Sequence, residues 1–193
     1  MQKITLPSLF HNQSGAMFGL DARIALAIFG ILSVVAGVSA INVFSQAGTT
    51  ALTTELTNMK KAYTEFHLST SEHTLKFLDL VNNESEIPGW SGPYVDGMLS
   101  DKSRGHGTYS LTEGRQDVPG VPPVECSGGI CGIWLKLTKV KDGLARDVDK
   151  ALDGDDSPNG GTFRIEFIPG AVDDVYYLIS TNRNGSMATR SAE

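Results

Sequence analysis

The stretch from Ile24 to Phe44 (IALAIFGILSVVAGVSAINVF) constrains this chain most, because it runs for 21 residues without a charged side chain. A helix that crosses a bilayer needs about 20 consecutive, predominantly apolar residues. The stretch therefore predicts a membrane-spanning helix over residues 17–44 and argues against a wholly cytosolic protein.

A helical pattern continues beyond the apolar stretch while the composition becomes polar. Leu52, Leu56, Met59, Tyr63 and Phe66 recur at spacings of four and three, which places one apolar stripe on a helix. We expect residues 45–86 to be an amphipathic continuation of the same helix. A single helix of some 55–60 residues would span about 80–90 Å at 1.5 Å per residue.

From Ile87 onward, alternation of apolar and polar residues replaces the helical period. Four segments read as strands, and one intervening segment reads as a short helix because Leu144, Val148 and Leu152 recur every four residues. The expected strands are 108–111, 132–139, 162–168 and 175–180. We expect an α+β fold, with the long N-terminal helix packed on a small antiparallel sheet in a globular region over 87–182, and a flexible tail over 183–193.

Charge and cysteine content exclude some functions. The 193 residues carry a formal net charge of −6, and the chain has no run of Lys or Arg, which argues against nucleic-acid binding. Cys126 and Cys131 are too few for a disulfide scaffold but suit one disulfide bond in an exported domain. The chain contains no Gly-x-Ser-x-Gly, His-Glu-x-x-His, Walker or dinucleotide motif, so we expect a protein that is not an enzyme.

The N-terminal region has three interpretations. A cleaved secretory signal would use small residues at 38–40 or 45–47, but the apolar stretch exceeds the usual 7–15 residues and Asp21 precedes it. A simple membrane anchor for an outer domain is the second. The third starts from residues 14–21 (SGAMFGLD), which together with the apolar helix resemble the class III signal of type IV pilins and type II secretion pseudopilins.

The resemblance implies that a prepilin peptidase removes a short leader and that the new N-terminus is methylated. The cut could follow Gly15 or Ala16. We prefer the second, with residues 1–16 as the leader and Met17 as the N-methylated first residue. Asp21 then occupies the fifth mature position, where the family carries an acid, and Gly30 the fourteenth, where a glycine is common.

Asp21 and Gly30 are the candidate assembly residues. An acid in a membrane is costly unless it is paired, and the resemblance implies that Asp21 neutralises the terminal amine of an adjacent subunit. The alternative is an ordinary acid at a helix N-terminus, favoured by the helix dipole.

The segment 89–95 (GWSGPYV) resembles the Trp-x-Gly-Pro-Tyr segment that follows the long helix in many pilins. We expect a turn there, with Trp90 and Tyr94 packing beneath the sheet.

Asp173 and Asp174 form an acidic pair before the last expected strand. We expect a turn there whose acids are solvated.

Two parts of the chain contain potential metal ligands. Asp155, Ser157, Asn159 and Glu166 have the outline of a calcium loop, and the alternative is an acidic turn with Asp153 or Asp155 as a cap. Among the four histidines, His67 and His73 fall on the predicted helix six residues apart and so share no face, which leaves no zinc site. Calcium is the one cofactor that the sequence suggests.

The resemblance implies a structural subunit of a type IV pilus or type II secretion pseudopilus. Such a subunit is an inner-membrane precursor that polymerises through its N-terminal helix into an extracellular pilus or a periplasmic pseudopilus. Its expected partners are copies of itself, the prepilin peptidase and the assembly machinery. The alternative is a membrane-anchored or secreted binding domain that does not polymerise.

Overall fold

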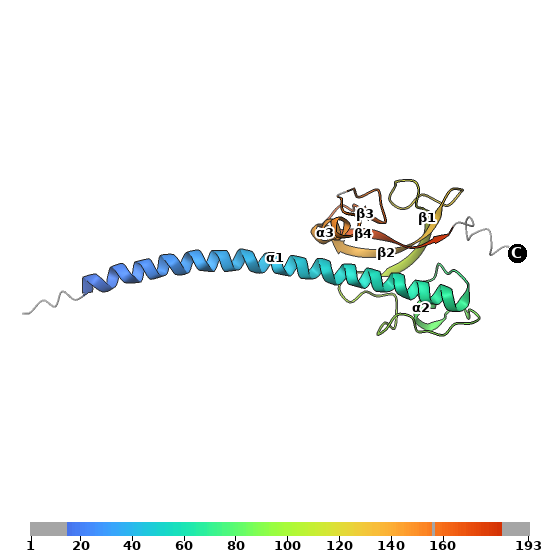
Figure 1. Cartoon of the computed structure of the whole chain (residues 1–193), viewed down its shortest axis with the longest axis horizontal. Helices are drawn as coiled ribbons and strands as arrows, with labels where there is room; N and C mark the ends of the chain where they lie inside the picture. Colours follow the sequence, from blue (N-terminus) through green and yellow to red (C-terminus); the bar gives the residue numbers. More distant parts are fainter. Residues whose placement is uncertain (1–14, 156, 183–193) are drawn as a thin grey trace, which may run out of the picture. The chain divides into compact units, whose positions relative to one another are not determined.

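The computed structural model of the chain describes residues 15–155 and 157–182 (Figure 1). The predicted leader, except for its last two residues, and the predicted flexible tail lie outside these residues. The chain divides into a first unit that ends at Phe44 and a second unit that begins at Ser45. The elements are α1 (Gly15–Thr70), α2 (Asp79–Asn82), β1 (Tyr109–Arg115), β2 (Cys131–Lys141), α3 (Asp142–Asp153), β3 (Phe163–Glu166) and β4 (Val172–Asn182).

The sheet of the second unit has four strands in the order β1-β2-β4-β3, and every neighbouring pair is antiparallel. Its central pair runs from Cys131↔Asn182 to Lys141↔Val172, with two register shifts along the way. Each strand overlaps a predicted one, and α3 covers the predicted short helix. A long N-terminal helix followed by a four-stranded antiparallel sheet confirms the expected α+β class.

The apolar stripe on α1 forms the core of the second unit. Its members are between 0 and 6% exposed, which confirms the prediction: Leu52, Leu56, Met59, Tyr63 and Phe66. They belong to one cluster with the side chains of the sheet's inner face, including Ile133, Leu135, Leu137, Val175 and Tyr177. Burial of large apolar side chains stabilises a fold by about 1.5–3 kcal/mol for each. This stripe therefore fixes the sheet against α1.

The expected helical continuation over residues 45–86 is too long, because α1 ends at Thr70. Ser71 adopts a left-handed conformation (φ 57°), which ends the helix and reverses the chain. The buried hydroxyl of Tyr63 then donates to the carbonyl of Thr74 at 3.2 Å and accepts from its amide at 3.3 Å. These two bonds hold the segment that follows the helix against α1, and only the short α2 forms within it.

The returning segment is fixed by the buried carboxylate of Asp79. It accepts hydrogen bonds from the hydroxyl of Thr74 and from the amide of Ser85. The indole of Trp90 donates to the carbonyl of Asp79 at 2.6 Å, and the ring of Tyr94 packs edge-on against Phe66 at 5.7 Å. Trp90 and Tyr94 are therefore half-buried against the core, which confirms part of the prediction, but these contacts are with α1 and α2 rather than with the sheet.

A second, smaller apolar cluster lies on the outer face of the sheet and contains Trp134, Tyr176 and Leu178, with Val121 packed against it. The buried guanidinium of Arg164 lies 4.3 Å from the ring of Trp134. It donates to the main-chain carbonyls of Gly120 (3.1 Å) and Gln116 (3.2 Å). Arg164 thereby holds the segment after β1 onto the sheet through backbone atoms.

Candidate functional site

The apolar part of α1 in the first unit exposes its side chains in every direction. Its large apolar residues from Leu20 to Phe44 are 52–75% exposed. Residues 19–70 include a window that is long and apolar enough to cross a membrane, and none of that window is buried. The hydroxyls of Ser33 and Ser39 donate to carbonyls one turn back, at Phe29 and Val35, so they present no free donor to lipid.

The candidate cleavage and assembly residues all lie on α1. Gly15, Ala16 and Met17 belong to the first turn of α1. Asp21 is exposed, and a Cβ atom added at Gly30 would meet nothing within 4 Å. A neighbouring helix could therefore approach the backbone closely at Gly30.

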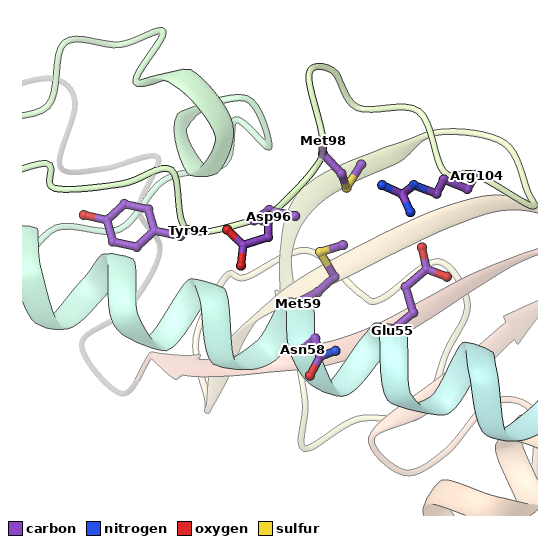
Figure 2. A pocket seen from close by; sticks show the side chains of 8 residues that line it. Glu55, Asn58, Met59, Tyr94, Asp96, Met98 and Arg104 are labelled. Carbon is purple, nitrogen blue, oxygen red and sulfur yellow. The ribbon is translucent and has the colours of Figure 1, made fainter.

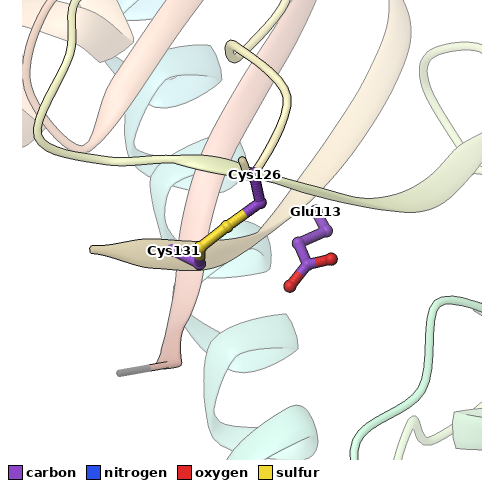
Figure 3. A group of neighbouring side chains, drawn as sticks. All are labelled: Glu113, Cys126 and Cys131. Atoms are coloured by element: carbon purple, nitrogen blue, oxygen red, sulfur yellow. A yellow bond between two sulfur atoms is a disulfide. The ribbon is translucent and has the colours of Figure 1, made fainter. Parts of the chain in front are cut away.

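Cys126 and Cys131 form a disulfide bond, with their Cα atoms 5.8 Å apart, as predicted (Figure 3). The bond ties the loop before β2 to the first residue of that strand. The carboxylate of Glu113 lies beside the two sulfur atoms. Among the described residues, no other group of three His, Cys, Asp or Glu side chains brings its ligand atoms this close together. Because both sulfurs are in the disulfide, neither is a thiolate that could bind a metal.

The proposed calcium residues separate into two groups. Asp155 accepts from the amide of Ser157 at 2.9 Å, and Asp153 accepts from the amide of Phe163 at 2.7 Å, so both acids cap the turn as the alternative interpretation expects. Glu166 instead accepts from the hydroxyl of Tyr176 at 2.7 Å. The described residues thus assign Glu166 to the face of the sheet, and calcium binding near Asn159 stays a prediction.

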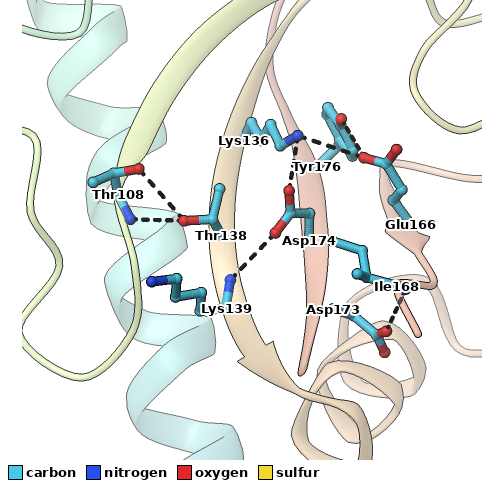
Figure 4. Close-up of polar contacts among 9 residues, drawn as sticks. All are labelled: Thr108, Lys136, Thr138, Lys139, Glu166, Ile168, Asp173, Asp174 and Tyr176. Atoms are coloured by element: carbon cyan, nitrogen blue, oxygen red, sulfur yellow. Dashed lines mark hydrogen bonds and ion pairs between the residues drawn. The ribbon is translucent and has the colours of Figure 1, made fainter. Parts of the chain in front are cut away.

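Glu166 belongs to a polar network on the outer face of the sheet (Figure 4). The ammonium of Lys136 lies 2.8 Å from Asp174 and 3.5 Å from Glu166. Burial, followed by the hydrogen bond to Glu166, raises the pKa of Tyr176 to about 12. The predicted solvation of Asp173 and Asp174 is wrong: they are 1 and 9% exposed. Asp173 turns inward because its carboxylate accepts from the amide of Ile168 at 3.1 Å.

A pocket of about 500 Å³ lies between α1 and the segment 94–104 (Figure 2). Its lining includes two acids, Glu55 and Asp96, and one cation, Arg104. Glu55 accepts from the hydroxyl of Tyr109 at 2.6 Å, and burial together with this bond raises the pKa of Tyr109. Burial lowers the pKa of the nearby His106, against the opposing charge of Glu55. The lining offers hydrogen bonds and charges of both signs.

The two histidines at the end of α1 correct another expectation. The rings of His67 and His73 stack, with centroids 4.1 Å apart and planes inclined by 13°. The predicted separation on one helix is wrong because the chain reverses at Ser71. The Nδ1 atom of His67 donates to the carbonyl of Glu72 at 2.8 Å, which fixes its ring at this turn.

No family model, curated protein or solved structure matches the chain. A functional interpretation therefore depends on its own residues and geometry. Sequence reasoning missed the buried charges Asp79 and Arg164, because isolated polar residues in loops and strands give no periodic signal. It also missed the pocket at Glu55, whose walls come from segments far apart in the sequence.

Proposed function

We propose that this chain is a structural subunit of a type IV pilus or a type II secretion pseudopilus and that it polymerises through α1. One observation supports the proposal above the others: a helix that exposes a stretch without charged residues, Ile24 to Phe44, continues into the core of a folded unit. The first part has no internal face to bury itself against. The second part is already occupied by the sheet.

Burial of the exposed part requires lipid or other copies of the helix. Exposed apolar surface on this scale marks an interaction surface, since soluble proteins rarely leave large contiguous patches uncovered. Head-to-tail contacts between identical subunits that do not close into a ring generate a helical filament. In our proposal the bilayer covers residues 19–44 in the precursor, and neighbouring helices cover them in the filament.

Asp21 would set the position of one helix along its neighbour, because its carboxylate pairs with the terminal amine of another copy. A carboxylate at the start of an apolar segment is stabilised when a cation pairs with it. Cleavage after Ala16 creates such a cation, the methylated amine of Met17. The absence of a side chain at Gly30 lets a neighbouring helix approach the backbone of α1 closely, as it does at Gly19 and Gly37.

A second candidate function is a membrane-anchored binding domain that never polymerises. The pocket at Glu55, Asp96 and Arg104 favours it, since a concave site with a few convergent polar groups is what small ligands use. This alternative needs the apolar helix only as an anchor.

The first test is mass spectrometry of the protein from its native membranes. We expect a product of 177 residues, sixteen fewer than the chain, that begins with N-methylated Met17. A start at a neighbouring residue would keep the class and correct the cut site. An uncut Met1, or a start near Gly48, would reject the filament proposal.

The second test compares Asp21→Ala with its matched control Asp21→Glu. Both variants should insert into the membrane, because the apolar stretch is unchanged. We expect filaments from Asp21→Glu and none from Asp21→Ala when sheared fractions are viewed by electron microscopy. Normal filament yield from Asp21→Ala would contradict the pairing.

A further inference from the structure

α3 packs beside the residues of the second unit that directly follow the apolar stretch. The hydroxyl of Ser45 donates to the carboxylate of Asp147 at 3.1 Å. One turn further along α1, Leu144 lies 3.7 Å from the position that a Cβ atom on Gly48 would take. Because Ser45 is bonded to Phe44, α3 lies at the end of the second unit where the chain leaves the apolar stretch.

The connection between β3 and β4 reaches the same place. We call residues 167–172 (FIPGAV) the hairpin tip. The guanidinium of Arg146 on α3 lies 4.9 Å from the ring centroid of Phe167. Asp147 binds Ser45 and the adjacent Arg146 covers Phe167, so α3 links the start of the second unit to the hairpin tip.

The hairpin tip carries no charged side chain and exposes apolar ones. Phe167 is 47% exposed, Ile168 41% and Val172 36%. The two acids that follow it, Asp173 and Asp174, turn away from solvent to bind the amide of Ile168 and the ammonium of Lys136. Both acids are buried, and Asp174 is paired with Lys136, so neither carboxylate lies on the exposed surface of the tip.

The ends of β2 and α3 beside the tip carry exposed cations although the whole chain is acidic. Lys141 lies opposite Val172 in the register of β2 and β4, and it is exposed. Lys139 and Arg146 are exposed as well. Among the acids on these elements, Asp147 is exposed and hydrogen-bonded to Ser45, and Asp142 is half-buried. Glu166, next to Phe167, is also half-buried and is bound by Lys136 and the hydroxyl of Tyr176. An apolar centre with a basic rim is complementary to a surface of anionic lipid headgroups.

We infer that the hairpin tip docks on the anionic surface of the bilayer that residues 24–44 span. Phe167, Ile168 and Val172 enter the boundary between headgroups and acyl chains. Lys141 and Arg146 extend toward the lipid phosphates, as long cationic side chains do at such interfaces. The inference needs only a membrane-spanning apolar stretch, which both candidate functions share, so its failure leaves the filament proposal untouched.

The test places a fluorescent label on the tip of the full-length chain in lipid nanodiscs. Cys126 and Cys131 are joined, so an introduced cysteine is the one available thiol. Ala171→Cys carries an NBD label at the tip and leaves its three large apolar residues intact. Leu68→Cys is the matched control, since Leu68 is 76% exposed and lies about 35 Å along α1 from Ser45 at 1.5 Å per residue.

In phosphatidylcholine that contains phosphatidylglycerol, we expect blue-shifted emission at 171 and loss of most of it to brominated lipids. The label at 68 should stay in water and be quenched by iodide. Phosphatidylcholine alone should reduce the effect at 171. The substitutions Phe167→Ser and Ile168→Ser together should abolish it, with an unchanged circular dichroism spectrum as the check on folding.

Equal behaviour of the two labels, whether both in water or both in lipid, would overturn the inference. So would a shift at 171 that survives the double serine variant. If that variant fails to fold, Lys141→Glu with Arg146→Glu replaces it. This charge reversal should move the label at 171 into water in the anionic nanodiscs, and an unchanged blue shift would reject docking on anionic lipid.

Discussion

α1 contains two regions of similar length and opposite behaviour. From Leu20 to Phe44 every large apolar side chain is at least half exposed, whereas from Ser45 to Thr70 five large residues lie in the core. Both regions are α-helical, so backbone geometry does not distinguish them. From Ile24 onward the first region is apolar all round, whereas the second is apolar along one stripe. The arrangement of apolar residues around the helix therefore determines which part the sheet can cover.

The largest expected effect separates the two regions with one substitution in each. Leu56→Ala removes a fully buried side chain and should lower the free energy of unfolding of the second unit by about 2–5 kcal/mol. Leu32→Ala, the matched control in the first region, should change it by less than about 0.5 kcal/mol. Urea titration in detergent micelles, followed by tryptophan fluorescence, measures both. Equal losses would show that the two regions share one cooperative core.

One acid in each region of the chain tests the same difference, with a smaller expected change in the free energy of unfolding. Asp79→Ala leaves the hydroxyl of Thr74 and the amide of Ser85 without their acceptor, which should cost about 1–3 kcal/mol. Asp21→Ala should leave the same unfolding transition unchanged because Asp21 is exposed. The same titration tests the pair. A stable Asp79→Ala variant would mean that water replaces the carboxylate.

Two glycines give a smaller effect, of opposite sign. Gly48→Ala adds a methyl group at ordinary contact distance from Leu144 and should stabilise the second unit by about 0.5–1 kcal/mol, because alanine favours helix. Gly30→Ala should leave that stability unchanged and, under the filament proposal, lower filament yield. Thermal melting and electron microscopy report the two outcomes. Destabilisation by Gly48→Ala would show that α3 cannot accommodate the methyl group.

The smallest effect concerns two tyrosines near the end of α1. Burial raises the pKa of Tyr63. At Tyr94 the slight burial acts in the same direction, but hydrogen bonds with Ser69 and Ser91 prevail and lower its pKa. Tyr94→Phe should therefore remove the first phenol to ionise in an absorbance titration, with little change in stability at neutral pH.

The raised pKa of Tyr63 also fixes the sign of an alkaline effect. Its contribution to stability is complete below the ordinary tyrosine pKa of about 10 and is lost as pH rises toward the folded value. Tyr63→Phe should weaken the dependence of stability on pH above 10, as urea titrations at several pH values would show. An unchanged dependence would assign it to the other buried tyrosines.

Periodic features were predictable from the sequence. The stripe from Leu52 to Phe66 and the alternating strands follow from local spacing, and the short gap between Cys126 and Cys131 permits their disulfide. The end of α1 was not predictable, because Ser71 is no obvious helix terminator. Ser71 adopts a left-handed conformation, and the chain that follows it is held by a hydrogen bond from the hydroxyl of Tyr63 to the carbonyl of Thr74. These two residues are eleven positions apart, so local spacing does not reveal the contact.

The candidate site was predictable to a lesser extent. The apolar stretch was identifiable from the order of residues alone, since it lies on one helix, and the assembly roles of Asp21 and Gly30 stay predictions. The burial of Asp174 and the partners of Glu166 were not, because Lys136 and Tyr176 come from other strands. The local composition predicts that acids in a turn are exposed to water. In the structure, contacts between strands determine whether they are buried.

The hydrogen bonds from Arg164 to the segment after β1 have an evolutionary consequence. It binds the carbonyls of Gly120 and Gln116, and every amino acid supplies a carbonyl. Mutations that change the side chain at position 116 keep this attachment, so this surface can diversify while its path over the sheet stays constant. The backbone of this segment can thus keep its position while the side chains that it presents to solvent change.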